Sequence, residues 1–200
     1  MLSEFQVFLR LGFEHIADLR GYDHILFIVA LCAGYEPRHW RKLLVLVTAF
    51  TVGHSITLAL ATLRIIHIND ALVEFLIPLT IFITGVMNIV VSSPDAGGMV
   101  EGRRARLAKY FLALGFGLIH GMGFSNFLRS LLGAEEGIAL PLFAFNVGLE
   151  LGQILIVLTI LILTFVVVRL ARMRRHDWVL VLSGAAAGVA LTLMIERFPG

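Results

Sequence analysis

Histidines inside apolar runs are the residues of this 200-residue sequence best suited to chemistry. His24 follows Asp23 at the start of one run, His54 and His120 lie inside two others, and Glu150 lies inside a fourth. An ionisable side chain in hydrocarbon costs several kcal/mol, so its presence there needs a reason. Three imidazoles and a carboxylate are the ligand types of a transition-metal site.

If the apolar runs are helices, further polar residues lie close to these candidate ligands. Asp23 and Asn146 are placed to orient a histidine by hydrogen bonding. His15, which precedes Asp23 in the sequence, is placed to close the site from above. Two sets share a helical face at spacings of three and four residues: Thr51, His54 and Ser55, and Asn146, Glu150 and Gln153. A single histidine has a plainer interpretation as a packing residue between helices. A buried carboxylate in the same set favours the metal site.

Depth in a bilayer decides whether the candidates can meet. At a rise of about 1.5 Å per residue, His54 lies roughly 18 Å above Lys42 and His120 roughly 16 Å above Lys109. The same count puts His24 about 21 Å and Glu150 about 17 Å from that side of a core ~30 Å thick. The sequence therefore predicts that these four residues share one level slightly outside the midplane.

The elements that must position these residues are membrane helices. Apolar residues make up 58% of the chain, charged residues 15%, and the mean hydropathy is +0.92. Soluble domains carry about 25% charged residues. Cys32 is the one cysteine, which excludes a disulfide scaffold or a zinc finger. The basic residues form short clusters between apolar runs, which argues against nucleic acid as a partner. We expect an all-α integral membrane protein with one membrane domain over residues 1–200.

Six apolar runs are candidate spans of the bilayer, counted against roughly 20 residues for a full crossing, and the first of them is short. The expected spans cover residues 21–35, 40–63, 73–91, 107–132, 139–170 and 178–195. Residues 1–19 instead show an apolar face opposite a charged one, which predicts an amphipathic helix on the outer surface, either as an interfacial anchor or as a lid. Acidic residues and Arg10 make this segment unlike a signal peptide.

The distribution of basic residues predicts the orientation. Eleven of the 16 Lys and Arg residues lie in the segments 38–42, 103–109 and 169–175, which alternate with the more weakly charged connections. Under the positive-inside rule, these segments are cytoplasmic and both termini lie outside.

Two further patterns concern helix contacts. Thr80, Thr84 and Asn88 recur every four residues on the third span, either as interhelical hydrogen-bonding groups or as a polar track from the metal level towards the cytoplasm. Glycines on either side of His120 allow a close helix approach or a bend. Gly184 and Gly188 form a small-residue pair that predicts packing inside the bundle.

Four sequence blocks resemble the HupE/UreJ family of hydrogenase and urease accessory membrane proteins. They are His15 with GYDHILF (21–27), FTVGHSITL (50–58), GLIHGMGF (117–124) and FNVGLELGQ (145–153). The resemblance implies a small helical protein of the bacterial inner membrane that takes up nickel or cobalt for metalloenzyme maturation, with maturation proteins as possible partners. Carried over by position, it implies metal roles for His15, Asp23, His24, His54, His120 and Glu150.

Three functions therefore fit the sequence. The first is a divalent metal permease, in which Thr84 and Asn88 let the ion leave. The second is an intramembrane metal-dependent hydrolase with Glu150 or Asp23 as general base and Ser55 or Asn146 steadying the developing charge. The third is an assembly subunit with a structural metal. Imidazole suits nickel, zinc, cobalt, copper and iron alike, so the metal stays open, as does an oligomeric state.

Overall fold

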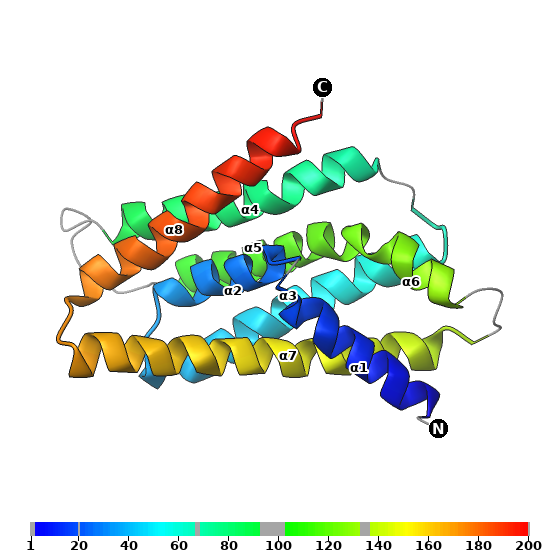
Figure 1. The fold of residues 1–200 in the computed structure, drawn as a ribbon, viewed down its shortest axis with the longest axis horizontal. Helices are drawn as coiled ribbons and strands as arrows, with labels where there is room; N and C mark the ends of the chain where they lie inside the picture. Colours follow the sequence, from blue (N-terminus) through cyan, green and yellow to red (C-terminus); the bar gives the residue numbers. More distant parts are fainter. Residues whose placement is uncertain (1–2, 20, 67–68, 93–102, 133–136, 200) are drawn as a thin grey trace.

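The computed structural model describes residues 3–19, 21–66, 69–92, 103–132 and 137–199, and all regular structure in these ranges is helical (Figure 1). Arg20 lies outside these ranges. The helices, in chain order, are α1 (Glu4–Ala17), α2 (Asp23–Ala33), the 3-10 turn η1 (Pro37–His39), α3 (Trp40–Thr62), α4 (Asp70–Val91), α5 (Arg103–Gly123), α6 (Ser125–Leu132), α7 (Ala139–Phe165), the π-helical turn η3 (Val166–Leu170) and α8 (Arg175–Glu196).

Four of these helical segments are long and apolar enough to cross a membrane: Pro37–Thr62, Asp70–Val91, Ala139–Leu170 and Arg175–Glu196. The pair α5 and α6 can form a fifth crossing with a bend of 49°. The prediction of an all-helical membrane protein is therefore confirmed. The predicted count of six spans is not confirmed, because α2 has only 11 residues where roughly 20 are needed for a full crossing.

The predicted span 107–132 is broken near Phe124, where α5 ends and α6 begins. Gly121 and Gly123 precede the break, and glycine weakens a helix because it loses the most backbone entropy. The Ser125 hydroxyl donates to the Met122 carbonyl at 2.9 Å, which satisfies a carbonyl at the end of α5. The bend turns the polar residues of α6 towards the ends of α3 and α4.

Helix α1 packs along the first half of α7 and runs in the same direction (Figure 1). Gly12 faces the backbone of Phe145 and Leu149, and Gly148 faces that of Leu9 and Phe13, so the two backbones meet with no side chain between them. The predicted N-terminal helix is therefore present. Its predicted place on the outer membrane surface is not confirmed, because its buried face lies against α7.

Helix α2 continues from the end of α1 towards the opposite end of the bundle (Figure 1). Ile16, near the end of α1, contacts Gly152 in the middle of α7. Gly34, just after α2, accepts a hydrogen bond from Arg175 at the start of α8. Together α1 and α2 run the length of the other helices, with an interruption halfway.

Close backbone contact also joins α3 to α5. Gly117 and Gly121 on α5 face the carbonyls of Phe50 and His54, and Gly53 on α3 faces that of Leu114. The glycines near His120 thus serve the close approach that the sequence predicted. This contact fixes His54 and His120 on two neighbouring helices.

The predicted packing role of Gly184 and Gly188 is wrong. No atom of another described residue lies within 4 Å of where a Cβ would stand on either glycine. Helix α8 instead packs through the row one position earlier, since Ser183 and Ala187 meet Gly85 of α4. The two glycines lie on the exposed face of α8.

Candidate metal centre

Three histidines from three helices converge inside the bundle. His15 lies near the end of α1, His24 in the first turn of α2 and His54 in the second half of α3. One ring nitrogen of each lies within 4.8 Å of the other two. We call these residues the imidazole trio. The interruption between α1 and α2 makes the arrangement possible, because it lets the end of one helix and the start of the next face the same helix.

The trio has ring nitrogens without a protein partner. His15 Nε2, His24 Nε2 and both nitrogens of His54 are buried and make no hydrogen bond to the described residues. Leaving a buried polar group unpaired costs about 1–3 kcal/mol, so each such group needs an explanation. Neutral imidazole nitrogens that point at one another are a donor set for a transition-metal ion.

Aromatic rings enclose the trio. The His15 ring lies 3.9 Å from Phe124 and 5.7 Å from Phe145, measured between centroids, and the Phe50 ring lies 6.4 Å from that of His24. Such walls exclude water and lower the local dielectric constant, which strengthens any interaction between the imidazoles and a cation. Phe124 also sits at the break between α5 and α6, so the bend shapes one wall of the site.

His120 lies next to the trio but is held by another partner. Its ring centroid is 5.1 Å from that of His24. Its Nε2 lies 3.0 Å from the hydroxyl of Thr80 on α4, and this hydroxyl also donates to the Ile77 carbonyl. With its proton directed to Ile77, the Thr80 hydroxyl accepts from Nε2–H, which leaves Nδ1 of His120 as the deprotonated nitrogen. Nδ1 has no partner among the described residues.

Asp23 directly precedes His24 in the sequence and therefore borders the trio. One carboxylate oxygen, Oδ2, lies 3.1 Å from Arg197 Nη1, after the end of α8. The other, Oδ1, is buried without a partner among the described residues. The sequence pattern singled out Asp23 but missed Arg197, which follows the last span. Counting the depth of the end of α8 in the membrane could have shown that Arg197 and Asp23 lie at the same level.

Glu150 is not a member of the trio. Its carboxylate accepts a hydrogen bond of 2.7 Å from the Thr48 hydroxyl. Thr48 precedes His54 by six residues on α3, a rise of about 9 Å. Glu150 does not belong to the group of converging ligand atoms, and its role as a metal ligand stays a prediction.

Among the other polar residues of the predicted site, Thr51 and Gln153 join α3 to α7. Thr51 donates to the Gln153 side-chain oxygen at 2.6 Å in a buried contact. The Ser55 hydroxyl donates to the Thr51 carbonyl of its own helix at 2.6 Å. Asn146 is half-buried on α7, one residue after Phe145, which packs on His15. These contacts form a polar seam beside the trio rather than within it.

Thr84 and Asn88 lead from His120 towards the other end of the bundle. The Thr84 hydroxyl donates to the Thr80 carbonyl at 2.8 Å, and the Asn88 amide donates to the Ala30 carbonyl of α2 at 2.6 Å. Both side chains also line a cavity of about 1040 Å³ at that end. Asn88 makes an interhelical hydrogen bond of the kind that the sequence predicted, whereas the Thr84 bond lies within α4.

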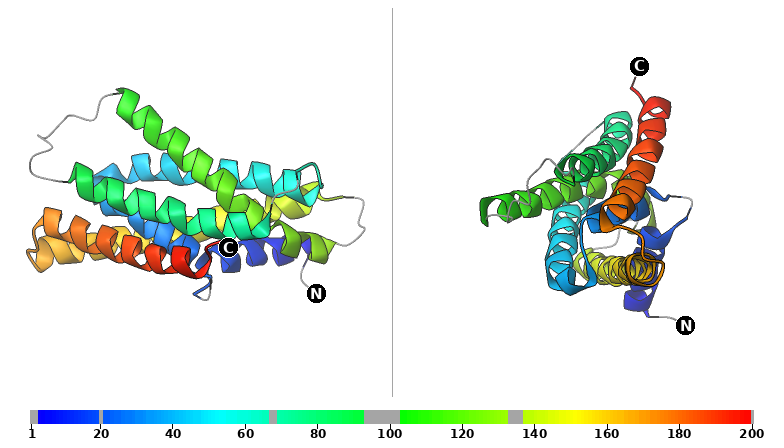
Figure 2. Two further views of the ribbon diagram at one scale, coloured as in Figure 1. Left: turned by 90° about the horizontal axis from the view of Figure 1, so that it is seen from above. Right: turned by 90° about the vertical axis from the view of Figure 1, so that its left-hand side faces the viewer.

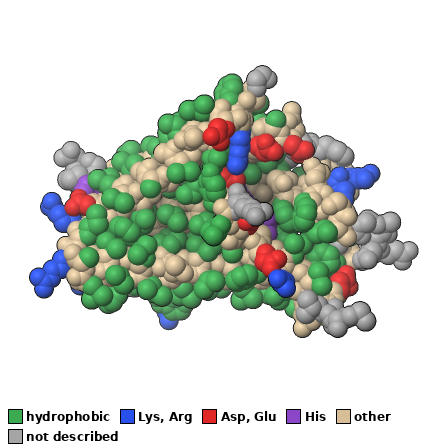
Figure 3. Space-filling model, in the orientation of Figure 1, with side chains coloured by type: hydrophobic (Ala, Val, Ile, Leu, Met, Phe, Trp, Pro, Cys, Tyr) green, Lys and Arg blue, Asp and Glu red, His purple; other side chains and the backbone are tan. Residues whose placement is uncertain are grey.

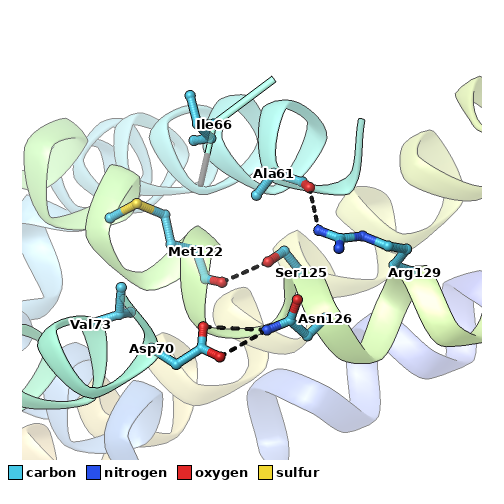
Figure 4. Close-up of a pocket in the computed structure, with 8 residues that line it drawn as sticks. All are labelled: Ala61, Ile66, Asp70, Val73, Met122, Ser125, Asn126 and Arg129. Carbon is cyan, nitrogen blue, oxygen red and sulfur yellow. Dashed lines mark hydrogen bonds between the residues drawn. The ribbon is translucent and has the colours of Figure 1, made fainter. Parts of the chain in front are cut away.

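A smaller pocket of about 200 Å³ lies where α3 ends and α4 begins (Figure 4). Within it, the Asn126 amide donates to both carboxylate oxygens of Asp70, at 3.1 and 3.3 Å. Arg129 donates to the Ala61 carbonyl at 2.6 Å. These contacts tie α6 to both neighbouring helices and so hold the bend that follows His120.

Acidic side chains gather on the same half of the molecule as the trio. In Figure 3, Asp and Glu lie mostly on the right-hand half of the face shown, around a hollow in which a histidine is visible. Glu14 and Asp18 are exposed residues near His15, and Glu196 is exposed near Arg197. This charge attracts cations towards this half of the molecule.

These features define a helical membrane protein with a buried histidine cluster. Residues 1–197 match the family model described as HupE / UreJ protein, so the chain belongs to the HupE/UreJ family. The match covers all four blocks that carry the resemblance. No curated protein and no solved structure matches the chain. Membership of this family suggests an accessory membrane protein concerned with nickel or cobalt.

Proposed function

We propose that this protein is a permease for a divalent transition-metal ion, nickel or cobalt, that supplies metalloenzyme maturation. The observation that carries the proposal is the imidazole trio, whose ring nitrogens converge within 4.8 Å and include buried atoms without a described protein partner. Family membership supports the choice of metal.

The trio is near the geometry that an ion needs. Metal–nitrogen bonds of about 2.0–2.1 Å place two ligands on one ion roughly 3–3.4 Å apart. Nitrogens within 4.8 Å reach that spacing by moving about an ångström or less each. His120 stands beside the trio as a further ligand, since its Nδ1 has no described partner while Nε2 stays bonded to Thr80. A site that closes around its ion by small movements can also release it, as transport requires.

Helices α1 and α2 act, in this proposal, as one interrupted crossing. The end of α1 lies halfway along α7, where Ile16 contacts Gly152, and next to His15 of the trio. Transporters commonly place their ion sites at such breaks, near the middle of the bilayer. Counting this interrupted crossing with the other five restores six crossings. Both termini then lie outside and the basic segments inside the bacterial membrane, as the basic residues predict.

The polar residues of α4 form the exit in this proposal. Thr80 touches His120, Thr84 bonds to Thr80, and Asn88 lies one further turn towards the cavity. Hydroxyl and amide oxygens bind a divalent ion more weakly than imidazoles bind nickel, so the ion can move from the trio towards them. A resident catalytic metal does not need such a path.

The test measures binding and transport on the same variants. His24→Ala and His54→Ala should each reduce bound nickel in purified protein to a small fraction of the wild-type value and abolish entry of nickel or cobalt into liposomes. His176→Ala is the matched control, because this histidine lies at the opposite end of the bundle, in the first turn of α8. It should bind nickel normally, and it serves as a control for binding alone because His176 lines the cavity at the end of the proposed exit.

Two outcomes would overturn parts of the proposal separately. Tight binding by wild-type protein without movement of nickel or cobalt across liposomes would reject the permease and leave the metal site. Full metal occupancy in both histidine variants would reject the trio as the site.

A further inference from the structure

The cavity of about 1040 Å³ has features that metal transport does not explain. It lies at the end of the bundle where α3, α5 and α8 begin and α2 and α4 end. Figure 2 shows that α5 diverges from α4 towards its first residues, and the cavity occupies the space between these helices and their neighbours. Its volume is at the upper end of ligand sites, which measure about 300–1,000 Å³.

One side of the cavity is strongly basic. The described residues that line it include no acidic side chain and four permanent cations, Arg38, Lys42, Lys109 and Arg175. Glu36 lies nearby and pairs with both arginines, at 3.0 Å to Arg38 and 2.8 Å to Arg175. One carboxylate thus stands against two guanidinium groups, and the described residues that line the cavity, taken together with Glu36, carry a net positive charge. A basic chamber of this kind favours an anion.

The other side of the cavity is apolar. Leu31, Leu46 and Phe116 line its interior from α2, α3 and α5. A free inorganic anion gains nothing from such a wall. A molecule with an anionic head and a hydrocarbon chain matches both sides, because burial of each CH₂ group contributes about 0.8 kcal/mol.

The margins of the cavity face the bilayer. Met87 and Val91 on α4 and Leu112 on α5 line it and are 40%, 65% and 38% exposed. Helix α4 is long and apolar enough to cross a membrane, and α5 belongs to the bent pair that also qualifies. Exposed apolar residues on such helices contact lipid chains, so hydrocarbon can enter the cavity from the side.

We propose that this cavity binds an anionic phospholipid of the surrounding leaflet. Its phosphate lies among Arg38, Lys42 and Arg175, and an acyl chain lies along Leu31 and Phe116. Basic pockets between membrane helices on the cytoplasmic side bind anionic lipid headgroups in this way. The inference goes beyond metal transport and stands without it, since the contacts involve neither the trio nor an ion.

A bound headgroup would also change the cavity for a cation. Thr84 and Asn88 line the same space as the basic side chains, which repel a divalent ion. An anionic phosphate offsets part of that charge. Lipid bound here would therefore regulate metal release if the protein transports metal, but lipid binding is measured without metal.

The test is native mass spectrometry of the full-length protein in detergent, titrated with palmitoyl-oleoyl phosphatidylglycerol or phosphatidylcholine. The wild-type protein should retain one phosphatidylglycerol under conditions that strip phosphatidylcholine. The double variant Arg38→Gln and Lys42→Gln should weaken retention about tenfold or more, because each basic residue near an anionic headgroup contributes about 1 kcal/mol. Arg10→Gln, an exposed residue of α1 far from the cavity, should retain the lipid as the wild type does.

A second variant tests the apolar side without changing charge. Leu31→Trp places a bulky aromatic ring in the cavity and should displace the lipid. The charge-state distribution in the mass spectrum and the thermal unfolding midpoint show whether the variant keeps its fold. Equal retention of both lipids, or unchanged retention in the Arg38/Lys42 double variant, would overturn the proposal. Displacement of the lipid by millimolar inorganic phosphate would show a site for free anions and would overturn it as well.

Discussion

Arg197 Nη1 lies 3.1 Å from Asp23 Oδ2 and joins the end of α8 to the first residue of α2. The two side chains are 29% and 15% exposed, so water screens the pair only in part. The arginine neutralises the carboxylate next to His24. The trio is therefore less attractive to a divalent ion than it would be beside an unpaired carboxylate.

Replacing Arg197 by Gln should raise the affinity for metal. The change leaves Asp23 negatively charged beside the imidazole trio. A unit charge about 8 Å away interacts by about 2 kcal/mol with each unit charge of the ion at an effective dielectric constant near 20, so we expect Kd for nickel to fall about thirtyfold or more. Isothermal titration calorimetry of purified protein with nickel measures this Kd. Arg10→Gln removes a comparable arginine from its exposed pair with Glu14 and should leave Kd unchanged. An unchanged Kd in Arg197→Gln would show that Asp23 does not act on the trio.

The glycines of α5 give a prediction about stability. A Cβ on Gly121 would collide with the His54 carbonyl and the Thr57 hydroxyl. Gly121→Ala should therefore force α5 away from α3 and lower the free energy of unfolding by about 1–3 kcal/mol. Gly115 lies on the same helix with no described atom within 4 Å of its Cβ position. Gly115→Ala should be neutral or stabilise by up to about 1 kcal/mol.

Thermal unfolding in detergent, followed by circular dichroism, compares the two variants. Because His54 lies at the contact, Gly121→Ala should also reduce nickel binding, while Gly115→Ala should not. Equal unfolding midpoints would contradict the close contact of α3 with α5.

The apolar runs of the sequence predicted most of the fold. The expected spans 40–63, 73–91 and 178–195 agree with α3, α4 and α8 to within a few residues, because hydrophobic length sets a membrane helix. The break near Phe124 could not be predicted, since nothing in residues 107–132 separates a bend from the close packing that glycines also permit. The packing of α1 against α7 was not predicted because an apolar face is equally suited to a membrane surface and to a neighbouring helix.

The site was predicted in part for a related reason. Polar residues in hydrocarbon identified His15, His24 and His54, which the structure brings together. The depth count that put Glu150 with the histidines assumed helices of matched length perpendicular to the membrane, and this placement stays a prediction. The segment Ala139–Leu170 has 32 residues, or about 48 Å, and must tilt or extend beyond a core of ~30 Å. Residue counts from its ends therefore do not give depth.

A substitution of Glu150 tests whether this residue binds the metal or only joins α7 to α3. Glu150→Gln keeps an oxygen that can accept from Thr48, so the fold should be retained. If the trio alone holds the ion, nickel bound per protein molecule should stay near the wild-type value in elemental analysis. His54→Ala is the reference for loss of metal. A loss as large in Glu150→Gln would make this residue a ligand, as the sequence predicted.

The interrupted crossing formed by α1 and α2 leads to a prediction about topology. If α1 and α2 together cross the bilayer, Ser3 and Gly137 lie on one side and Ala171 on the other. In a protein whose buried Cys32 is replaced by Ala, single cysteines at these three positions should react differently with a membrane-impermeant maleimide. In intact cells, Ser3→Cys and Gly137→Cys should label, and Ala171→Cys should label only after the membrane is opened. If Ser3→Cys labelled together with Ala171→Cys instead, α1 and α2 would not cross the bilayer, and the trio would lose its place at a break in a membrane helix.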